Sequence, residues 1–254
     1  MMLSDQQLLQ YSRQILLPDI DIEGQQKIID AHVVIVGLGG LGSPVALYLA
    51  AAGVGKLTLV DDDRVDVSNL QRQIVHSFES QQQLKVDSAK QSLLKLNPSC
   101  QIDTLNQRLN EDKMSALVEK STLVCDCSDN FSTRFLLNRV CFSHKKPLIS
   151  GAAIRWEGQL TSFTMQPNTA CYRCLYDEND STDVSCEQNG IIGPVVGTIG
   201  CLQATEAIKA ISAAGQLAVG QLLLFDALDC SFSKINFEQK ADCPVCYQRD
   251  GDQG

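Results

Sequence analysis

Short apolar runs alternate with longer amphipathic segments along the first 150 residues of the chain. Residues 33–36 form a β-branched apolar run, which is typical of a strand buried on both faces of a parallel sheet. Glycines follow, and an apolar, alanine-rich segment then predicts a helix over 41–52. Residues 56–60 predict a second strand, so the whole segment indicates a βαβ unit with a right-handed crossover.

The same alternation continues and then changes near residue 158. It predicts further helices over 82–96, 111–119 and 131–143, and strands over 102–105, 122–127 and 147–150. Beyond this point it predicts a long helix over 198–213 and a meander of strands over 159–165, 221–226 and 232–237. We therefore expect a doubly wound, Rossmann-like α/β fold whose mostly parallel sheet is extended by antiparallel strands.

Two segments fall outside this alternation. Residues 3–30 are polar with scattered apolar positions and predict an N-terminal helical arm. Residues 176–193 are polar and predict a long loop, a kind of segment that is usually functional or disordered.

Composition and charge narrow the class of protein. The 254 residues include 21 Lys and Arg against 30 Asp and Glu, a net charge of -9, which argues against a nucleic-acid-binding or anionic-membrane surface. No apolar run reaches membrane-spanning length, and the N-terminus lacks the apolar core of a signal peptide, so we expect a cytoplasmic protein. The 11 cysteines are then an odd number of thiols in a reducing compartment, which disfavours a complete disulfide framework.

A glycine-rich loop connects the first predicted strand to the first helix of the βαβ unit. Gly37, Gly39 and Gly42 form G-x-G-x-x-G, and Gly40 is a further position without a side chain that would hinder a ligand. Such a loop lets the backbone approach a phosphate, which the free N–H groups of the helix start bind. Asp61 ends the second strand, where a carboxylate accepts hydrogen bonds from ribose hydroxyls. The motif alone does not separate a dinucleotide from ATP.

Charged and amide side chains after the next strands favour ATP. In doubly wound sheets, ligands bind beyond the carboxyl ends of the strands, where these groups would converge. Two cations would suit a triphosphate and a carboxylate would suit magnesium, a combination that hydride transfer does not need. The residues concerned are Asn69, Gln71, Arg72, Lys85, Asp129 and Asn130.

Two C-x-x-C pairs indicate a metal site. Cys171 and Cys174 form the first pair, and Cys243 and Cys246 form the second. Four thiolates suit a closed, tetrahedral structural zinc, which would fasten the C-terminal segment to the start of the polar loop. The alternatives are four reduced thiols or redox pairs, although neither pair opens a helix after a thioredoxin-like strand.

Cys186 stands apart in the polar loop and is a candidate reactive thiol. Its acidic neighbours should raise its pKa, so reactivity would need a compensating cation or a helix N-terminus. The remaining cysteines are interpreted as packed core residues: Cys100, Cys125, Cys127, Cys141, Cys201 and Cys230.

The sequence resembles one family over nearly its whole length. The matching segments, in order, are GLGGLGSP, SNLQRQ, DCSDN, SGAAIRWEGQ, CYRC, GPVVGTIG, EAIK and CPVC. They resemble the ThiF/MoeB family of sulfur-carrier adenylyltransferases, relatives of ubiquitin-activating enzymes. The resemblance implies one adenylation domain over 1–254, with a helical arm at 1–30, a nucleotide-binding half at 31–157 and a zinc-containing, carrier-binding half at 158–254.

The resemblance also implies a reaction and the residues that carry it. The C-terminal Gly-Gly carboxylate of a ubiquitin-like sulfur carrier would attack the α-phosphorus of Mg2+-bound ATP, giving an acyl-adenylate and pyrophosphate. Sulfur from a separate donor protein would then give a thiocarboxylate. Arg13 would reach the ATP of a partner subunit, which implies a homodimer. The implied nucleotide contacts are Gly37, Gly39, Gly40, Gly42, Asp61, Ser68, Asn69, Leu70, Gln71, Arg72, Lys85, Asp129 and Asn130.

Within the implied site, Arg72 and Lys85 would stabilise phosphate charge, Asp129 would position Mg2+, and Cys186 would handle sulfur on the carrier. The segments SNLQRQI and GPVVG favour a ThiS-type carrier of thiamin thiazole biosynthesis. A MoaD-type carrier of molybdopterin biosynthesis is the alternative. An NAD-dependent oxidoreductase and a non-catalytic carrier-binding scaffold are the more distant alternatives.

Overall fold

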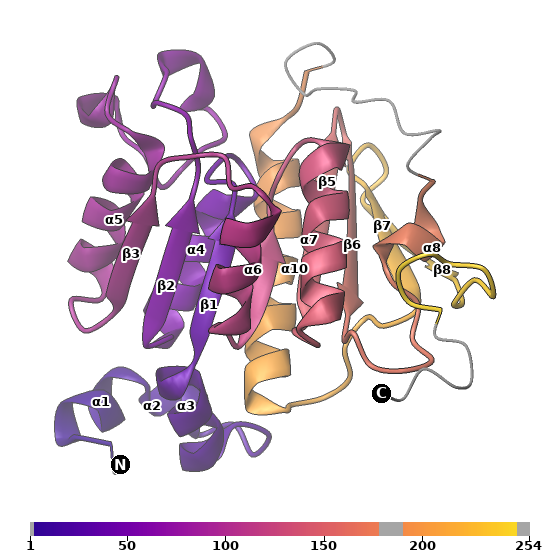
Figure 1. Cartoon of the computed structure of the whole chain (residues 1–254). Helices are drawn as coiled ribbons and strands as arrows, with labels where there is room; N and C mark the ends of the chain where they lie inside the picture. Colours follow the sequence, from indigo (N-terminus) through magenta and orange to yellow (C-terminus); the bar gives the residue numbers. More distant parts are fainter. Residues whose placement is uncertain (1–2, 178–189, 248–254) are drawn as a thin grey trace.

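A single mixed sheet runs through the chain, whose computed structural model describes residues 3–177 and 190–247 (Figure 1). The strand order is β3-β2-β1-β4-β5-β6-β7-β8. The parallel strands are β1 (His32–Val36), β2 (Lys56–Val60), β3 (Gln101–Leu105), β4 (Leu123–Asp126) and β5 (Leu148–Ile154). Three antiparallel strands extend them: β6 (Glu157–Phe163), β7 (Gln221–Asp226) and β8 (Ser231–Asn236). The expected fold class is confirmed.

Two apolar cores cover the two faces of the sheet. Val33 and Ile35 of β1 pack in one core, and Val34 and Val36 pack in the other, as the two-residue period of a strand requires. The first core includes side chains of α4 (Gly42–Ala52), α5 (Lys85–Leu96) and α10 (Gly193–Ser212). The second includes side chains of α6 (Glu111–Glu119), α7 (Phe131–Ser143) and α8 (Tyr172–Leu175).

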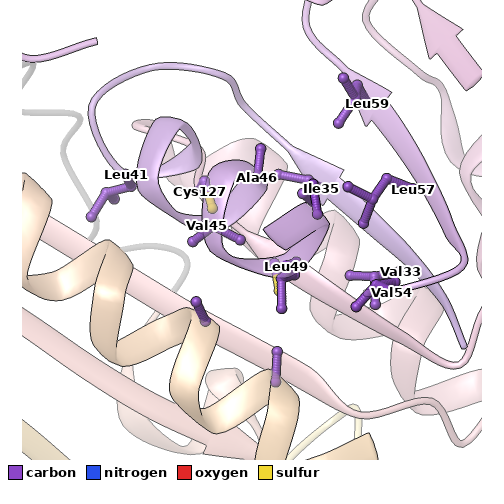
Figure 2. Packing of buried hydrophobic residues seen from close by; sticks show 14 of the residues in the cluster. Val33, Ile35, Leu41, Val45, Ala46, Leu49, Val54, Leu57, Leu59 and Cys127 are labelled. Atoms are coloured by element: carbon purple, nitrogen blue, oxygen red, sulfur yellow. The ribbon is translucent and has the colours of Figure 1, made fainter. Parts of the chain in front are cut away.

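The packing of α4 on the sheet explains the alanine-rich composition of this helix. Figure 2 shows Val45, Ala46 and Leu49 of α4 close to the side chains of β1 and β2. Helix α4 also packs against α10, and Val45, Ala46 and Leu49 are fully buried. A helix covered on both sides in this way needs small alanines as well as larger apolar residues. No helix in the described part of the chain has an apolar stretch long enough to cross a membrane.

The N-terminal arm consists of α1 (Asp5–Gln10), α2 (Ser12–Ile15) and α3 (Asp21–Asp30). Ser4 begins α1 with a capping box, in which its side chain accepts from the Gln7 backbone N–H. Figure 1 shows the arm at the end of the sheet where the parallel strands begin. The ligand-binding end of a doubly wound sheet is the opposite one, where these strands finish.

Two helix boundaries differ from the prediction. We expected a helix from residue 82, but α5 begins at Lys85 because Gln82 has a left-handed φ of 66° and its N–H donates to the Val65 carbonyl. We expected a helix from residue 198, but α10 begins at Gly193. Pro194 lies in its first turn, where proline is tolerated because no intrahelical N–H is needed.

The cysteines assigned to the core separate into three groups. Cys100, Cys125, Cys127 and Cys141 are buried, as expected. Cys201 is only half-buried. The core interpretation is wrong for Cys230, which is exposed in the turn between β7 and β8 with a left-handed φ of 58°.

Candidate active site

The glycine loop lies between the carboxyl end of β1 and the start of α4. Gly37 has a left-handed φ of 91°, and a Cβ there would lie 2.6 Å from the Cys127 carbonyl oxygen. A Cβ on Gly42 would lie 1.9 Å from the Gly37 carbonyl oxygen. These two positions therefore admit only glycine, because the loop backbone folds tightly against the end of β4 and against itself.

The two other glycines have different surroundings. A Cβ on Gly40 would lie 2.6 Å from a methyl carbon of Val196, so the start of α10 presses on the loop. At Gly39 the nearest atom is Nε2 of Gln73, at 3.7 Å, which is an ordinary contact. Of the four loop glycines, Gly39 is therefore the one where a Cβ would meet no close contact.

Asp61 follows β2 and holds the glycine loop in place. Its Oδ2 accepts from the Leu38 N–H at 2.7 Å, and its Oδ1 accepts from the Asp63 N–H at 2.9 Å. Burial raises the pKa of this carboxyl, and the nearby Lys85 cation partly opposes that shift. A carboxylate has about four acceptor positions, so Asp61 retains capacity for two hydroxyl donors of a ligand.

Two cations lie beside this loop. The Lys85 ammonium forms an ion pair with Asp63 at 2.9 Å, and only 6% of its side chain is exposed. The Arg72 guanidinium donates to Asn69 Oδ1 at 3.0 Å and to the Ser68 carbonyl at 3.3 Å. Lys85 begins α5, and the short helix η1 (Val67–Asn69) precedes Arg72, so local structure orients both side chains.

Asp129 and Asn130 follow β4. The Asn130 side chain caps α7 by accepting from the Thr133 N–H at 2.9 Å, and its amide donates to Asp129 Oδ1 at 3.4 Å. Asp129 itself is exposed. The start of α7 thus fixes the backbone at Asn130 while the Asp129 carboxylate remains accessible to a ligand.

A buried polar cluster surrounds the end of β4, next to the loop that carries Asp129. Asp126 is fully buried and accepts from the Ser128 hydroxyl at 2.6 Å and the Ser150 hydroxyl at 3.1 Å. Arg134 of α7 donates to the Ser128 carbonyl at 2.9 Å. Burial raises the pKa of Asp126, and the Arg134 cation opposes that effect. Ser128, the residue that precedes Asp129, therefore bridges a buried carboxyl and a buried guanidinium.

These groups face one cavity of about 1050 Å³. The predicted site residues that line it are Gly37, Gly39, Gly40, Asp61, Asn69, Arg72, Lys85, Asp129 and Asn130. Sequence reasoning missed others that line it, among them Asp62, Asp63, Gln73, Arg108, Arg139 and Gln159. A signal existed for Asp62 and Asp63, which continue the acidic run from Asp61. Arg108 lies far away in the sequence and reaches the site through an ion pair with Asp62 at 3.1 Å.

Other predicted residues do not line this cavity. Gly42 has a packing role, the Ser68 hydroxyl donates to Asp66 at 2.6 Å, and Gln71 lies at a smaller cavity near Arg155 and Trp156. Leu70 is half-buried behind η1. Arg13 is exposed on α2, at the opposite end of the sheet (Figure 1). Cys186 lies outside the described residues.

The four paired cysteines form one buried cluster. Their sulfur atoms all lie within 4.8 Å of one another. The distance is 3.6 Å between Cys171 and Cys243 and 3.3 Å between Cys174 and Cys246. A hydrogen bond from the Cys171 thiol lowers the pKa of Cys174, and the Lys240 N–H, at 3.4 Å from its sulfur, has the same effect. A buried set of four sulfur donors fits a zinc site, in which sulfurs bound at about 2.3 Å lie about 3.8 Å apart.

The fold and the loop together define a nucleotide-binding α/β protein, and comparison with known proteins gives its family. The sequence profile of the ThiF family matches residues 11–245, and this chain belongs to that family. It is 48% identical to the molybdopterin-synthase adenylyltransferase of Salmonella typhimurium, over 97% of this chain and 99% of that protein. It is 44% identical to the sulfur carrier protein ThiS adenylyltransferase of Escherichia coli, over 96% of this chain and 97% of that protein.

A solved structure supports the same fold. The chain superimposes on a crystal structure of Escherichia coli MccB with MccA-N7isoASN at a TM-score of 0.82, covering 95% of this chain and 75% of that one. Sequence identity there is 21%, so this likeness shows the fold alone. The family resemblance expected from the sequence motifs is confirmed, and it leaves the NAD-dependent oxidoreductase alternative without support.

Proposed function

We propose that this protein uses ATP to adenylate the C-terminal carboxylate of a ubiquitin-like sulfur carrier, and that the carrier is of the MoaD type. The observation that carries the proposal is the meeting of the glycine loop, Arg72, Lys85 and Asp129 around one cavity. Family membership and two relatives named as adenylyltransferases support the same reaction. The reaction needs these groups because it transfers an adenylyl group, and negative charge develops on the pyrophosphate that leaves.

The proposed chemistry is a displacement at phosphorus. A carrier carboxylate oxygen forms a bond to the α-phosphorus while the bond from that phosphorus to the β-bridging oxygen breaks, and pyrophosphate leaves with the bonding pair. A carboxylate is already ionised, so no general base is required. Backbone N–H groups of the glycine loop, Arg72 and Lys85 would bind the phosphates, while Asp61 would accept from the ribose.

Magnesium has ligands available in this cavity. The exposed carboxylate of Asp129 lines it, and the three carboxylates Asp61, Asp62 and Asp63 lie within 4.8 Å of one another beside the glycine loop. Hard oxygen donors of this kind suit Mg2+, so the residues present fit the ion. When bound, Mg2+ neutralises phosphate charge. We assign Asp129 as the residue that would hold it.

We further assign Zn2+ to Cys171, Cys174, Cys243 and Cys246. The closeness of four buried sulfur atoms supports this assignment, because uncharged thiols gain little from such a cluster and a metal gains four ligands. With all four positions filled by protein, the zinc would be structural and would take no part in the reaction.

Arg13 would act in a homodimer. Arg13 does not belong to the described residues that line the cavity of its own chain, and the exposed apolar residues Leu16 and Leu17 directly follow α2. A second copy packed on this arm would cover those side chains and could place the partner's arginine at the phosphates. Mixing Arg13→Ala protein with Asp129→Ala protein tests the arrangement, since restored activity in the mixture requires sites shared between subunits.

The carrier type was expected from two motifs to be ThiS, and the comparisons favour the alternative. The molybdopterin-synthase adenylyltransferase is the more similar of the two relatives, at 48% against 44% identity. The ThiS-type carrier remains the second candidate, since that relative also matches over nearly its full length. With either carrier, sulfur has to be supplied after adenylation, and we propose that a separate donor protein supplies it.

The test is exchange of labelled pyrophosphate into ATP, run side by side with a MoaD-type and a ThiS-type carrier. We expect exchange that depends on the MoaD-type carrier and on Mg2+. Preference for the ThiS-type carrier would reverse the carrier assignment. No exchange with either carrier would refute the proposed reaction and would favour a non-catalytic carrier-binding scaffold.

A further inference from the structure

His76 is buried between the glycine loop and α5, and no motif in the sequence drew attention to it. Its side chain is 7% exposed. Nε2 lies 3.1 Å from the Leu38 carbonyl oxygen, in the middle of the glycine loop. Nδ1 lies 2.9 Å from the Ser88 hydroxyl, which is on α5. The ring therefore joins two elements that both contribute to the nucleotide cavity.

The chemistry of the two partners fixes the state of the ring. A carbonyl oxygen only accepts, so the Leu38 contact requires the proton to be on Nε2. A neutral ring then has a lone pair on Nδ1, which accepts from the Ser88 hydroxyl. Burial lowers the pKa of His76 to about 4, and the Lys85 cation acts in the same direction. The ring is therefore a neutral, single-tautomer donor to the loop.

The backbone of Leu38 needs hydrogen bonds to hold it in place, because flexible glycines lie on both sides of it. It lies between Gly37 and Gly39, and glycines give a loop unusual conformational freedom. Asp61 accepts from the Leu38 N–H at 2.7 Å, and His76 donates to its carbonyl oxygen. Both polar groups of the Leu38 residue are thus held by side chains, one from each of two different segments.

The other end of the link connects to a phosphate-binding cation. Ser88 lies three residues after Lys85, one turn further along α5. The chain of contacts from Leu38 through His76 to Ser88 therefore sets the distance between the glycine loop and the helix that carries Lys85. A ligand that contacts both would bind more tightly when this distance is already fixed in the free protein.

We propose that His76 is a positioning residue, which holds the glycine loop in register with α5 so that the loop and Lys85 bind the same ATP phosphates. The proposal rests on the proposed function for the identity of the ligand, and it adds a residue that touches neither substrate nor metal. Its role is to supply one hydrogen bond to Leu38 from a ring that Ser88 orients.

The experiment measures Mg2+-ATP affinity by calorimetry and KM and kcat in carrier-dependent pyrophosphate exchange. His76→Phe removes both hydrogen bonds, and we expect the Kd and KM for ATP to rise about fivefold or more while kcat changes less. His76→Gln retains an amide donor at the distance of Nε2, so it should restore affinity to within about twofold of the natural protein.

Ser92→Ala is the matched control. The Ser92 hydroxyl donates to the Val75 carbonyl at 2.7 Å, so it joins the same helix to the residue preceding His76 but has no contact with the glycine loop. This variant should leave the ATP affinity unchanged. If His76→Phe does not fold, Ser88→Ala replaces it, with a rise in Kd of about twofold or more expected because the ring loses its orientation.

Three results would overturn the proposal: equal ATP affinity in the His76 or Ser88 variant and in Ser92→Ala, no rescue by glutamine, or an Nδ1–H tautomer in imidazole nitrogen spectra. The binding measurement needs no carrier. A natural protein that binds ATP without exchange would therefore refute the proposed function and still test His76.

Discussion

The Lys85 ammonium and the Asp63 carboxylate form an ion pair of 2.9 Å in which the two partners have very different exposure. The lysine side chain is 6% exposed and the aspartate side chain is 65% exposed. A buried cation needs a counter-charge, and the exposed carboxylate of Asp63 supplies one that a phosphate can replace. The Lys85 cation is therefore available at the cavity for a phosphate, and Asp63 balances its charge when no phosphate is bound.

Lys85→Ala should lower kcat for pyrophosphate exchange by about a hundredfold or more, since it removes a cation that faces developing phosphate charge. Lys56→Ala is the control, because Lys56 forms an ion pair of similar length, 2.8 Å with Asp103, but begins β2, at the opposite end of that strand from the cavity. Similar losses in the two variants would argue against a role for Lys85 in the reaction.

Asp129→Asn should abolish most exchange and weaken the dependence of activity on Mg2+ concentration, because it removes the exposed carboxylate assigned to the ion. Asp112→Asn, an exposed substitution in the first turn of α6, should leave both unchanged. Full activity of the Asp129 variant in the pathway would favour the scaffold alternative.

Elemental analysis should find one zinc per chain, and Cys243→Ser should lose the metal and lower the melting temperature of the protein, because structural zinc contributes to folding energy. Cys230→Ser is the matched control: the same substitution at an exposed cysteine should change neither quantity. A pure, folded protein free of metal would contradict the assignment.

The free energy of unfolding should fall as the pH falls from the unfolded-state pKa of His76 towards its folded-state pKa. The folded-state pKa of about 4 lies below the ordinary value of 6.5. The unfolded chain therefore takes up a proton first, and acidification favours unfolding. Between about pH 7 and about pH 5 this group alone should cost about 2 kcal/mol. Denaturant titrations of the natural protein and of His76→Gln measure it, and identical pH dependence would refute the assignment.

Cys186→Ala should leave carrier adenylation intact while the yield of carrier thiocarboxylate falls, if this thiol handles sulfur as the family resemblance implies. Mass spectrometry of the carrier separates the two products. Cys230→Ala controls for the loss of any accessible thiol. An unchanged thiocarboxylate yield would remove the role assigned to Cys186.

The sequence predicted the parts of the fold that depend on local patterns. Residues 33–36 and 56–60 became β1 and β2 almost without change, because buried parallel strands need continuous apolar runs. The start of α5 was misplaced because Gln82 pairs with Val65, a contact that local periodicity does not show. The start of α10 was misplaced because Gly193-Pro194 is compatible with both a loop and a helix N-terminus.

The site was predictable where it follows strand ends and not where it depends on tertiary contacts. Asp61 directly follows one predicted strand and Asp129 lies two residues after another, so the topology alone brings them together. Arg108 and Arg134 could not be found in this way, since their partners are Asp62 and the Ser128 carbonyl, and neither contact leaves a motif. The sequence does not predict the role proposed for His76, because that role comes from burial between two segments rather than from the spacing of the residue.

Helix α7 runs from the cavity at the carboxyl ends of the parallel strands to the cysteine cluster. Asn130 caps it at the nucleotide cavity. Two turns later, Asn138 donates to the Cys171 sulfur at 3.5 Å and accepts from the Tyr172 N–H at 2.9 Å. Eight residues of helix span about 12 Å. The helix therefore connects the cysteine cluster to the loop that carries Asp129. The proposed structural zinc would stabilise the same helix that fixes the position of the carboxylate assigned to Mg2+.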